Sequence, residues 1–226
     1  MAEPRRLFLL VNALDEFTFG PLVREVLPGV RVTVGEDFPA HPADYHLVVL
    51  WSIRRLVPQA ASCPNAMVFH SSDLPRGKGW APVYHAIAGG LDRYTITGFI
   101  PAPEVDAGRV VVKASFRLRP DHTAENVRVF DRRIILMLAG QVMDRYPEAP
   151  PRGVEQTGEE TYHPRRRPQD NEVSLDARLG DLVPHLRACE PSHPAFFDYQ
   201  GVRYDIRVTP AVAPPFPDDL QVTFFE

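Results

Sequence analysis

Residues 46–51 read HLVVLW, and their consecutive apolar residues are typical of a strand that is buried on both faces of a sheet. The run RLFLLV at residues 6–11 has the same character and ends at a polar residue. Residues 30–34, VRVTV, alternate between apolar and polar side chains, and residues 66–70, AMVFH, lead into a polar loop. We therefore expect four strands between the start of the chain and His70.

Helical segments separate these expected strands. Apolar residues within 16–27 recur at the spacing of an amphipathic helix, which Pro28 and Gly29 end, and a short helix begins at Pro58. The alternation of strands and helices predicts an α/β fold with a Rossmann-like open parallel sheet. No Gly-x-Gly-x-x-Gly follows the first strand and no Gly-Lys-Ser/Thr loop occurs, so neither a dinucleotide site nor a P-loop is expected.

Two more strands and a long helix are predicted in the middle of the chain. Residues 94–100 and 109–118 are strand-like and a short loop joins them, so we expect them to pair as in a hairpin. Residues 81–88 predict a short helix. Residues 123–146 carry apolar side chains at three- and four-residue spacing, which predicts a long amphipathic helix.

The composition changes after the long helix. Residues 147–173 are polar and rich in proline, arginine and glutamate, and a short helix (179–188) and two strands around Gly201 follow. We expect residues 1–146 to form the main domain. Residues 147–226 would then form a linker and a small α+β C-terminal subdomain of one helix and a β-hairpin.

The overall composition is that of an ordinary globular protein, with 44% hydrophobic and 24% charged residues. The net charge of −4 argues against a partner recognised through nucleic-acid phosphates. Cys63 and Cys189 are too few for a disulfide framework or a four-cysteine zinc site, and no pair of histidines has metal-ligand spacing. Because every apolar run is too short for a signal sequence or a membrane span, we expect a cytoplasmic protein without membrane contact.

Polar and glycine-rich residues gather directly after the strand at 66–70, where residues 70–80 read HSSDLPRGKGW. Ligands of open parallel sheets bind at the carboxyl ends of the strands, and His70 would project there. A histidine at such a position can move protons near neutral pH. The alternative interpretation is an ordinary turn with a capping serine and a surface histidine.

The segment FHSSDLPRGKGWAP (69–82), followed later by VDAGRV (105–110), resembles the folate-dependent formyltransferases, among them the methionyl-tRNA and sugar N-formyltransferases. His70 and Asp106 stand at the spacing of that family's catalytic His and Asp. The resemblance implies the formyltransferase fold, 10-formyltetrahydrofolate as the formyl donor and small-molecule substrates. Near the end of the chain, YHPRRRPQDNEV and the stretch from LVPHLRA to YDIRV resemble the C-terminal portion of the sugar N-formyltransferases.

Two positions depart from the family's pattern. Val68 stands where the family has its catalytic asparagine, and Ser71 stands where it has a proline. In the family that asparagine is thought to donate a hydrogen bond to the formyl oxygen as negative charge develops there. Removing one such donor costs on the order of 10²–10³ in rate. Ser72 or a backbone N–H is the candidate replacement; without one, catalysis would be weak or absent.

The resemblance also suggests where the folate would bind. Ile53, Leu56 and Val57 align with the loop that wraps the pterin ring, and Val105 and Asp106 would complete the pocket. Plain core packing is the alternative explanation for the three apolar residues after the strand. The family's N-terminal part is shortened in this chain, because a proline-rich connection replaces one covering helix.

The acceptor would lie beside the same loop. Lys78 could hold it by charge and Trp80 by ring contact, although a solvated lysine and a half-buried tryptophan are equally good explanations. Residues 163–168, HPRRRP, suggest contact with an anion or a nucleotide phosphate, with a solvated loop as the alternative.

The resemblance of the C-terminal segment favours an amino-sugar nucleotide as acceptor, as in lipopolysaccharide biosynthesis. A hydroxylated amino acid, such as a siderophore precursor, is the alternative substrate. We do not expect a transfer RNA, because the chain is acidic and the stretch 147–226 is short for the additional C-terminal domain that such an acceptor would need. Val68 leaves a further alternative open: a non-catalytic relative that binds folate or a partner protein. Because family members often dimerise through terminal helices and hairpins, a homodimer is a further option.

Overall fold

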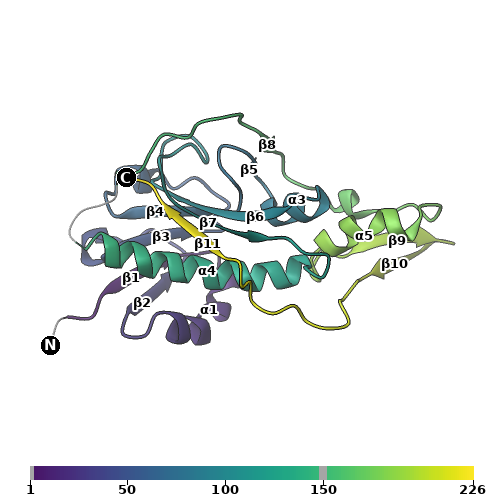
Figure 1. Ribbon diagram of the computed structural model, residues 1–226, viewed down its shortest axis with the longest axis horizontal. Coiled ribbons are helices and arrows are strands. Elements are labelled where there is room, and N and C mark those ends of the chain that lie inside the picture. Colours follow the sequence, from purple (N-terminus) through teal and green to yellow (C-terminus); the bar gives the residue numbers. More distant parts are fainter. Residues whose placement is uncertain (1–2, 148–151) are drawn as a thin grey trace.

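The computed structural model describes residues 3–147 and 152–226, and the side chains of residues 13–19 are outside this description. Over the described residues, the main sheet has seven strands (Figure 1). In order across the sheet they are β11 (Gln221–Phe224), β7 (Val110–Arg117), β6 (Arg93–Phe99), β4 (Ala66–His70), β3 (Leu47–Trp51), β1 (Arg6–Leu10) and β2 (Arg31–Gly35). The predicted α/β, Rossmann-like fold is confirmed.

The four strands of the N-terminal part, β1 to β4, form the parallel half of the sheet. β1 pairs with both β2 and β3, and β3 pairs with β4, all in parallel. Every residue of β3 is buried, as its continuous apolar sequence predicts. Because these strands are parallel, β3 and β4 both end at one edge of the sheet, with Trp51 next to Phe69 in the register.

The other half of the sheet is antiparallel. β6 pairs with β7, which confirms the predicted hairpin-like pair, and β6 also pairs with β4. The sheet is therefore mixed, and the predicted parallel arrangement ends at β4. β11 returns from the end of the chain to pair with β7. A division of the chain at residue 146 thus separates β11 from the sheet in which it pairs.

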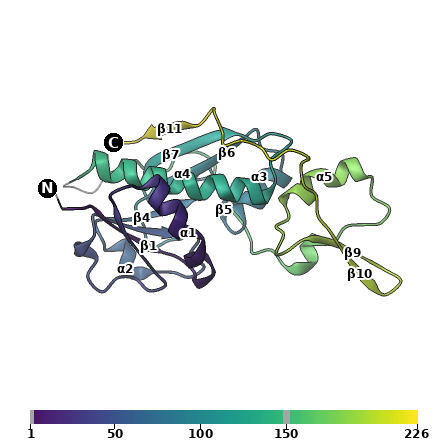
Figure 2. The same ribbon diagram turned by 90° about the horizontal axis from the view of Figure 1, so that it is seen from below.

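Two apolar cores lie on opposite faces of the sheet. α4 (Ala124–Arg145) and α1 (Ala13–Val26) contact each other over one face, as Figure 2 shows from below. Thr123 caps the start of α4: its hydroxyl accepts from the Asn126 N–H while the Asn126 side chain accepts from the Thr123 N–H. The short helix α2 (Pro58–Ala61) covers the second core on the other face.

The proline-rich connection before β3 holds only a short 3-10 helix, η1 (Pro42–Asp44). This agrees with the expectation that a covering helix is replaced in this part of the chain. None of the helices in the described parts of the chain is long and apolar enough to cross a membrane.

A smaller part of the chain projects from one end of the main sheet (Figures 1 and 2). It contains η2 (Pro168–Asn171), α5 (Leu179–Ala188) and a hairpin of β9 (Ala195–Tyr199) with β10 (Val202–Ile206). α5 packs against α3 (Pro82–Ala88) of the main part. A further pair, β5 (Lys78–Gly79) with β8 (Tyr162–His163), joins the glycine-rich loop to the polar segment after α4.

Candidate active site

The predicted site lies where β4 ends. His70 is the last residue of β4, and the loop that follows is anchored to the neighbouring strand β6. Thr97 of β6 is buried, and its hydroxyl donates to the Ser72 carbonyl at 2.6 Å. The loop thus starts from a fixed backbone position, as a site built on a rigid strand requires.

His70 and Asp106 meet, as the sequence predicts. His70 Nδ1 lies 3.7 Å from Asp106 Oδ2, and the two side chains are only 11% and 12% exposed. His70 Nε2 lies 2.9 Å from the Gly77 carbonyl oxygen. Because a carbonyl only accepts, Nε2 carries the hydrogen in the neutral ring and Nδ1 is left as the proton acceptor. The ring therefore presents its basic nitrogen toward the carboxylate.

Asp106 is held in an uncommon backbone conformation. Its φ is +52°, in the left-handed region that costs energy for a residue with a side chain. Its carboxylate oxygen Oδ2 accepts from the Gly79 N–H at 2.9 Å. Further along the turn, a Cβ on Gly108 would lie 1.6 Å from the Ile100 carbonyl oxygen, so only glycine fits there. The turn that places Asp106 beside His70 thus requires glycine at position 108.

Ser71, which replaces the family's proline, has a structural partner. Its hydroxyl donates to Asp131 Oδ1 of α4 at 2.8 Å, and the Tyr94 hydroxyl donates to the same oxygen at 2.7 Å. Burial raises the pKa of Asp131, and the two hydroxyl donors oppose that rise. This network ties the start of the loop to α4 beneath the sheet.

Ser72, the candidate oxyanion donor, holds its hydroxyl oxygen away from solvent. Its Oγ is buried and has no hydrogen-bond partner. A Cβ on Gly77 would lie 3.4 Å from that oxygen, so the loop folds over it. In this conformation the hydroxyl oxygen faces the loop interior, while the residue as a whole is half-buried.

The two candidate acceptor residues differ in their surroundings. The Lys78 side chain is 8% exposed, and its ammonium donates to Glu160 Oε2 at 2.8 Å. Its charge is therefore paired with an exposed carboxylate in this structure. Trp80 is half-buried, and the Arg165 guanidinium lies 5.1 Å from the centre of its ring. Arg165 belongs to the basic run at 163–168, which the fold thus brings beside the loop.

Two stacked histidines lie beside this loop, and no sequence pattern indicates them. The rings of His85 and His163 are 3.7 Å apart and nearly parallel. The pKa of His85 is lowered to about 4, mainly by burial and to a smaller extent by the nearby His163 and Arg166. The pKa of His163 is also lowered, by burial and by the neighbouring His70. His70 is therefore close enough to His163 to contribute to the lowered pKa of His163.

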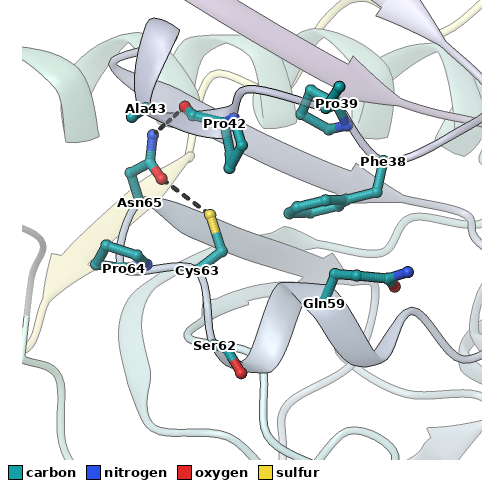
Figure 3. A pocket seen from close by; sticks show the side chains of 10 residues that line it. Phe38, Pro39, Pro42, Ala43, Gln59, Ser62, Cys63, Pro64 and Asn65 are labelled. Carbon is teal, nitrogen blue, oxygen red and sulfur yellow. Dashed lines mark hydrogen bonds between the residues drawn. The ribbon is translucent and has the colours of Figure 1, made fainter.

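A separate cavity of about 420 Å³ lies at the other end of β4 (Figure 3). Phe38, Pro42 and Cys63 line it, and Cys63 Sγ donates to Asn65 Oδ1 at 3.0 Å. Burial raises the pKa of the Cys63 thiol, which makes it a weak nucleophile. Because Cys63 precedes β4 and His70 ends it, this cavity is not part of the histidine site. Among the described residues, no cluster of His, Cys, Asp or Glu could hold a metal ion.

Comparison with known proteins finds formyltransferases among both the sequence relatives and the solved structures. No protein-family model matches the chain. A methionyl-tRNA formyltransferase of Leifsonia xyli is 30% identical over 153 residues, which is 66% of this chain and 49% of that protein. The chain spans about half the length of the curated relatives that it matches.

The solved structures agree in fold. HypX from Aquifex aeolicus, in a complex with tetrahydrofolic acid, covers 92% of this chain with a TM-score of 0.69 and 17% identity; 38% of the HypX chain is matched. A 4-N formyltransferase from Francisella tularensis covers 92% of this chain and 98% of its own, with a TM-score of 0.65 and 15% identity.

The chain is related to the folate-dependent formyltransferases.

The position of the family's catalytic asparagine is occupied by the apolar side chain of Val68. Val68 is half-buried and packs against the core on the α2 face of the sheet, as do Ile53 and Val57. Leu56 is 65% exposed and Val105 is 50% exposed, so neither is part of the core. The candidate folate residues therefore divide into a pair that packs inward, a pair of exposed apolar side chains, and Asp106.

Proposed function

We propose that the chain transfers the formyl group of 10-formyltetrahydrofolate to an amine. The observation that carries this proposal is the 3.7 Å approach of His70 Nδ1 to Asp106 Oδ2, in a nearly buried setting at the carboxyl end of β4. The relationship to the formyltransferases supports it. Residues 1–146 supply both members of the pair, and residues 147–226 add β8, the C-terminal hairpin and β11.

Formyl transfer requires one proton to leave the attacking amine and one to reach the leaving nitrogen. 10-Formyltetrahydrofolate supplies an activated formyl carbon bound to its N10 nitrogen. When an amine attacks that carbon, its nitrogen must lose a proton, and the leaving N10 must gain one. His70 Nδ1 takes the first proton and returns it to the leaving nitrogen, a role that contributes about 10²–10⁴-fold in rate. Asp106, 3.7 Å away, stabilises the ring while it is charged.

The surroundings of His70 and Asp106 fit 10-formyltetrahydrofolate in part. Ile53 and Val57, which the family resemblance would place against the flat pterin ring, are partly buried against the core, as is Val68. Near Asp106, the Oε1 oxygen of Gln156 is buried without a hydrogen-bond partner. A donor for the formyl oxygen is still to be identified, because the Val68 side chain has no hydrogen to donate and Ser72 Oγ is buried. A backbone N–H is the other candidate.

We favour an amino-sugar nucleotide as the acceptor. The similarity of residues 162–173 and 182–208 to the C-terminal portion of the sugar N-formyltransferases supports this choice. Two arginines of 163–168 lie against aromatic rings next to the glycine-rich loop, Arg165 over Trp80 and Arg166 over Tyr84, and guanidinium groups are suited to bind phosphates. Val68 favours a second candidate, a relative that binds folate without catalysing transfer.

The test is an acceptor screen. The protein is incubated with 10-formyltetrahydrofolate and either amino-sugar nucleotides or hydroxylated amino acids, and N-formyl products are detected by mass spectrometry. We expect a product with an amino-sugar nucleotide and about 10²–10⁴-fold slower formation of it by the His70→Ala protein. Folate binding without any product would favour the non-catalytic relative. A product from the amino acids alone would overturn the proposed acceptor.

A further inference from the structure

One segment of the chain, residues 153–163, anchors both groups that contact the His70 ring, and we call it the strap. At its start, Val154 and Val110 of β7 exchange two backbone hydrogen bonds, of 2.7 and 2.8 Å. At its end it forms β8, which pairs with β5 in the glycine-rich loop. In Figure 1 it runs past β5 on the side of the sheet opposite α4.

Gln156 ties the strap to the Asp106 turn. Its side-chain nitrogen donates to the Asp106 carbonyl and to the Gly108 carbonyl, both at 2.9 Å. These two carbonyls bracket the turn in which Asp106 has its left-handed φ. A strained residue persists only where its surroundings fix it. Gln156 supplies that restraint on the backbone, while the Gly79 N–H holds the carboxylate.

Thr161 ties the same strap to the other partner of the ring. Its hydroxyl accepts from the Gly77 N–H at 2.8 Å, and the Gly77 carbonyl is the group that binds His70 Nε2. Both contacts of the imidazole, Gly77 on one nitrogen and Asp106 near the other, are therefore anchored to one segment. That segment is distant in sequence from the loop that it holds.

We propose that Gln156 is a positioning residue, which fixes Asp106 against His70 and so sets the rate of proton transfer. The inference rests on the proposed function, because it concerns the same histidine. Gln156 reaches the pair only through the backbone of the Asp106 turn. Loss of its amide allows the turn to drift, and the Asp106 carboxylate moves with it. A misplacement of about 1 Å costs on the order of 10²-fold in rate.

The substitution Gln156→Ala removes both hydrogen bonds, and Gln156→Glu replaces the donating nitrogen by an oxygen of nearly the same size. We expect both variants to lower kcat about 10- to 100-fold with little change in the KM for the folate. Glu155→Gln is the matched control, because it alters the neighbouring residue, whose partner is the exposed Arg109. That control should leave kcat unchanged.

A double-mutant cycle separates positioning from a general structural effect. If Gln156 acts through Asp106, Gln156→Ala should have little further effect on kcat in the Asp106→Asn background. Effects that multiply in the double variant would overturn the inference. So would a wild-type kcat in both Gln156 variants.

A second measurement does not require activity. The Gly79 N–H donates to the Asp106 carboxylate, so its hydrogen-exchange protection reports whether that carboxylate stays in place. Gln156→Ala should lower this protection at least tenfold, and Glu155→Gln should not. Unchanged Gly79 protection would overturn the positioning role even in an inactive protein. An inactive wild type in which Gln156→Ala still lowers the protection would instead refute the proposed function alone.

Discussion

His70 Nδ1 lies 3.7 Å from Asp106 Oδ2, and the same carboxylate oxygen accepts a 2.9 Å hydrogen bond from the backbone of Gly79. The carboxylate thus lies between the histidine and the loop that follows it. Because Gly77 of that loop binds the other ring nitrogen, the imidazole is held from both sides. Such an arrangement fixes which nitrogen is basic, and this choice is what a proton-transferring histidine needs.

Removal of the histidine should abolish most of the transfer activity. We expect His70→Ala to lower kcat for formyl transfer about 10²–10⁴-fold, because no other side chain then takes the proton of the attacking amine. Folate affinity should change little. Single-turnover kinetics with 10-formyltetrahydrofolate measure the effect, and the exposed His41→Ala serves as a control. Full activity in a folded His70→Ala protein would contradict the assignment.

Restoring the family's asparagine should raise activity. Val68 is half-buried on β4, two residues before His70, its side chain has no hydrogen to donate, and the hydroxyl oxygen of Ser72 is buried in this structure. We expect Val68→Asn to raise kcat at least tenfold, toward the range of about 10²–10³ that one oxyanion donor contributes. Val68→Leu, which adds volume without a donor, is the control. An unchanged kcat in Val68→Asn would mean that another group already fills this role.

The Asp106 turn should not tolerate a side chain at Gly108. A Cβ there would lie 1.6 Å from the Ile100 carbonyl oxygen, and a backbone atom cannot move aside without distorting the strand end. We expect Gly108→Ala to lower the free energy of unfolding by about 3 kcal/mol or more. Gly180→Ala, where the added Cβ meets nothing within 4 Å, should leave it unchanged or slightly raised. Urea denaturation measures both; equal stability of the two variants would refute this account of the turn.

The stacked histidines should make the fold sensitive to acid. The pKa of His85 is lowered to about 4 in the folded protein, against about 6.5 in an unfolded chain. Between these values the unfolded chain binds a proton that the folded protein does not, so stability falls as the pH drops from about 6.5 to 4. His85→Phe keeps a ring against His163 but cannot titrate.

The measurement is the difference in melting temperature between pH 7 and pH 5. This difference should be smaller in His85→Phe than in the wild type, and unchanged in His41→Asn, which alters an exposed histidine. His163 has a lowered pKa as well, so part of the acid sensitivity should remain in the variant. A difference identical to that of the wild type would show that His85 does not contribute.

Sequence patterns predict the parts of this fold that repeat over several residues. The buried strand β3, the long helix α4 and the pairing of β6 with β7 are all found where the sequence predicts them. β5 and β8 are too short for any periodicity, and a large part of the chain separates them in sequence. β11 joins the sheet through a similarly distant contact. Short, long-range pairings of this kind carry no local signal.

The candidate site also has features that the sequence predicts and features that depend on long-range contacts. The meeting of His70 with Asp106 follows from residue type, spacing and family resemblance. The pairing of Lys78 with Glu160 and the enclosure of Ser72 Oγ depend on how a distant segment crosses the loop, which spacing cannot show. Gln156 was missed for this reason: a polar residue in a proline-rich stretch looks like a solvated one.

The most direct test of the central claim is a calorimetric titration of 5-formyltetrahydrofolate into the wild type and the Asp106→Ala protein. The account predicts binding on the order of micromolar affinity for the wild type, and clearly weaker binding for a folded Asp106→Ala protein. Absence of binding to the folded wild type would contradict a folate site beside His70. Equal affinity in the two proteins would place the folate away from Asp106.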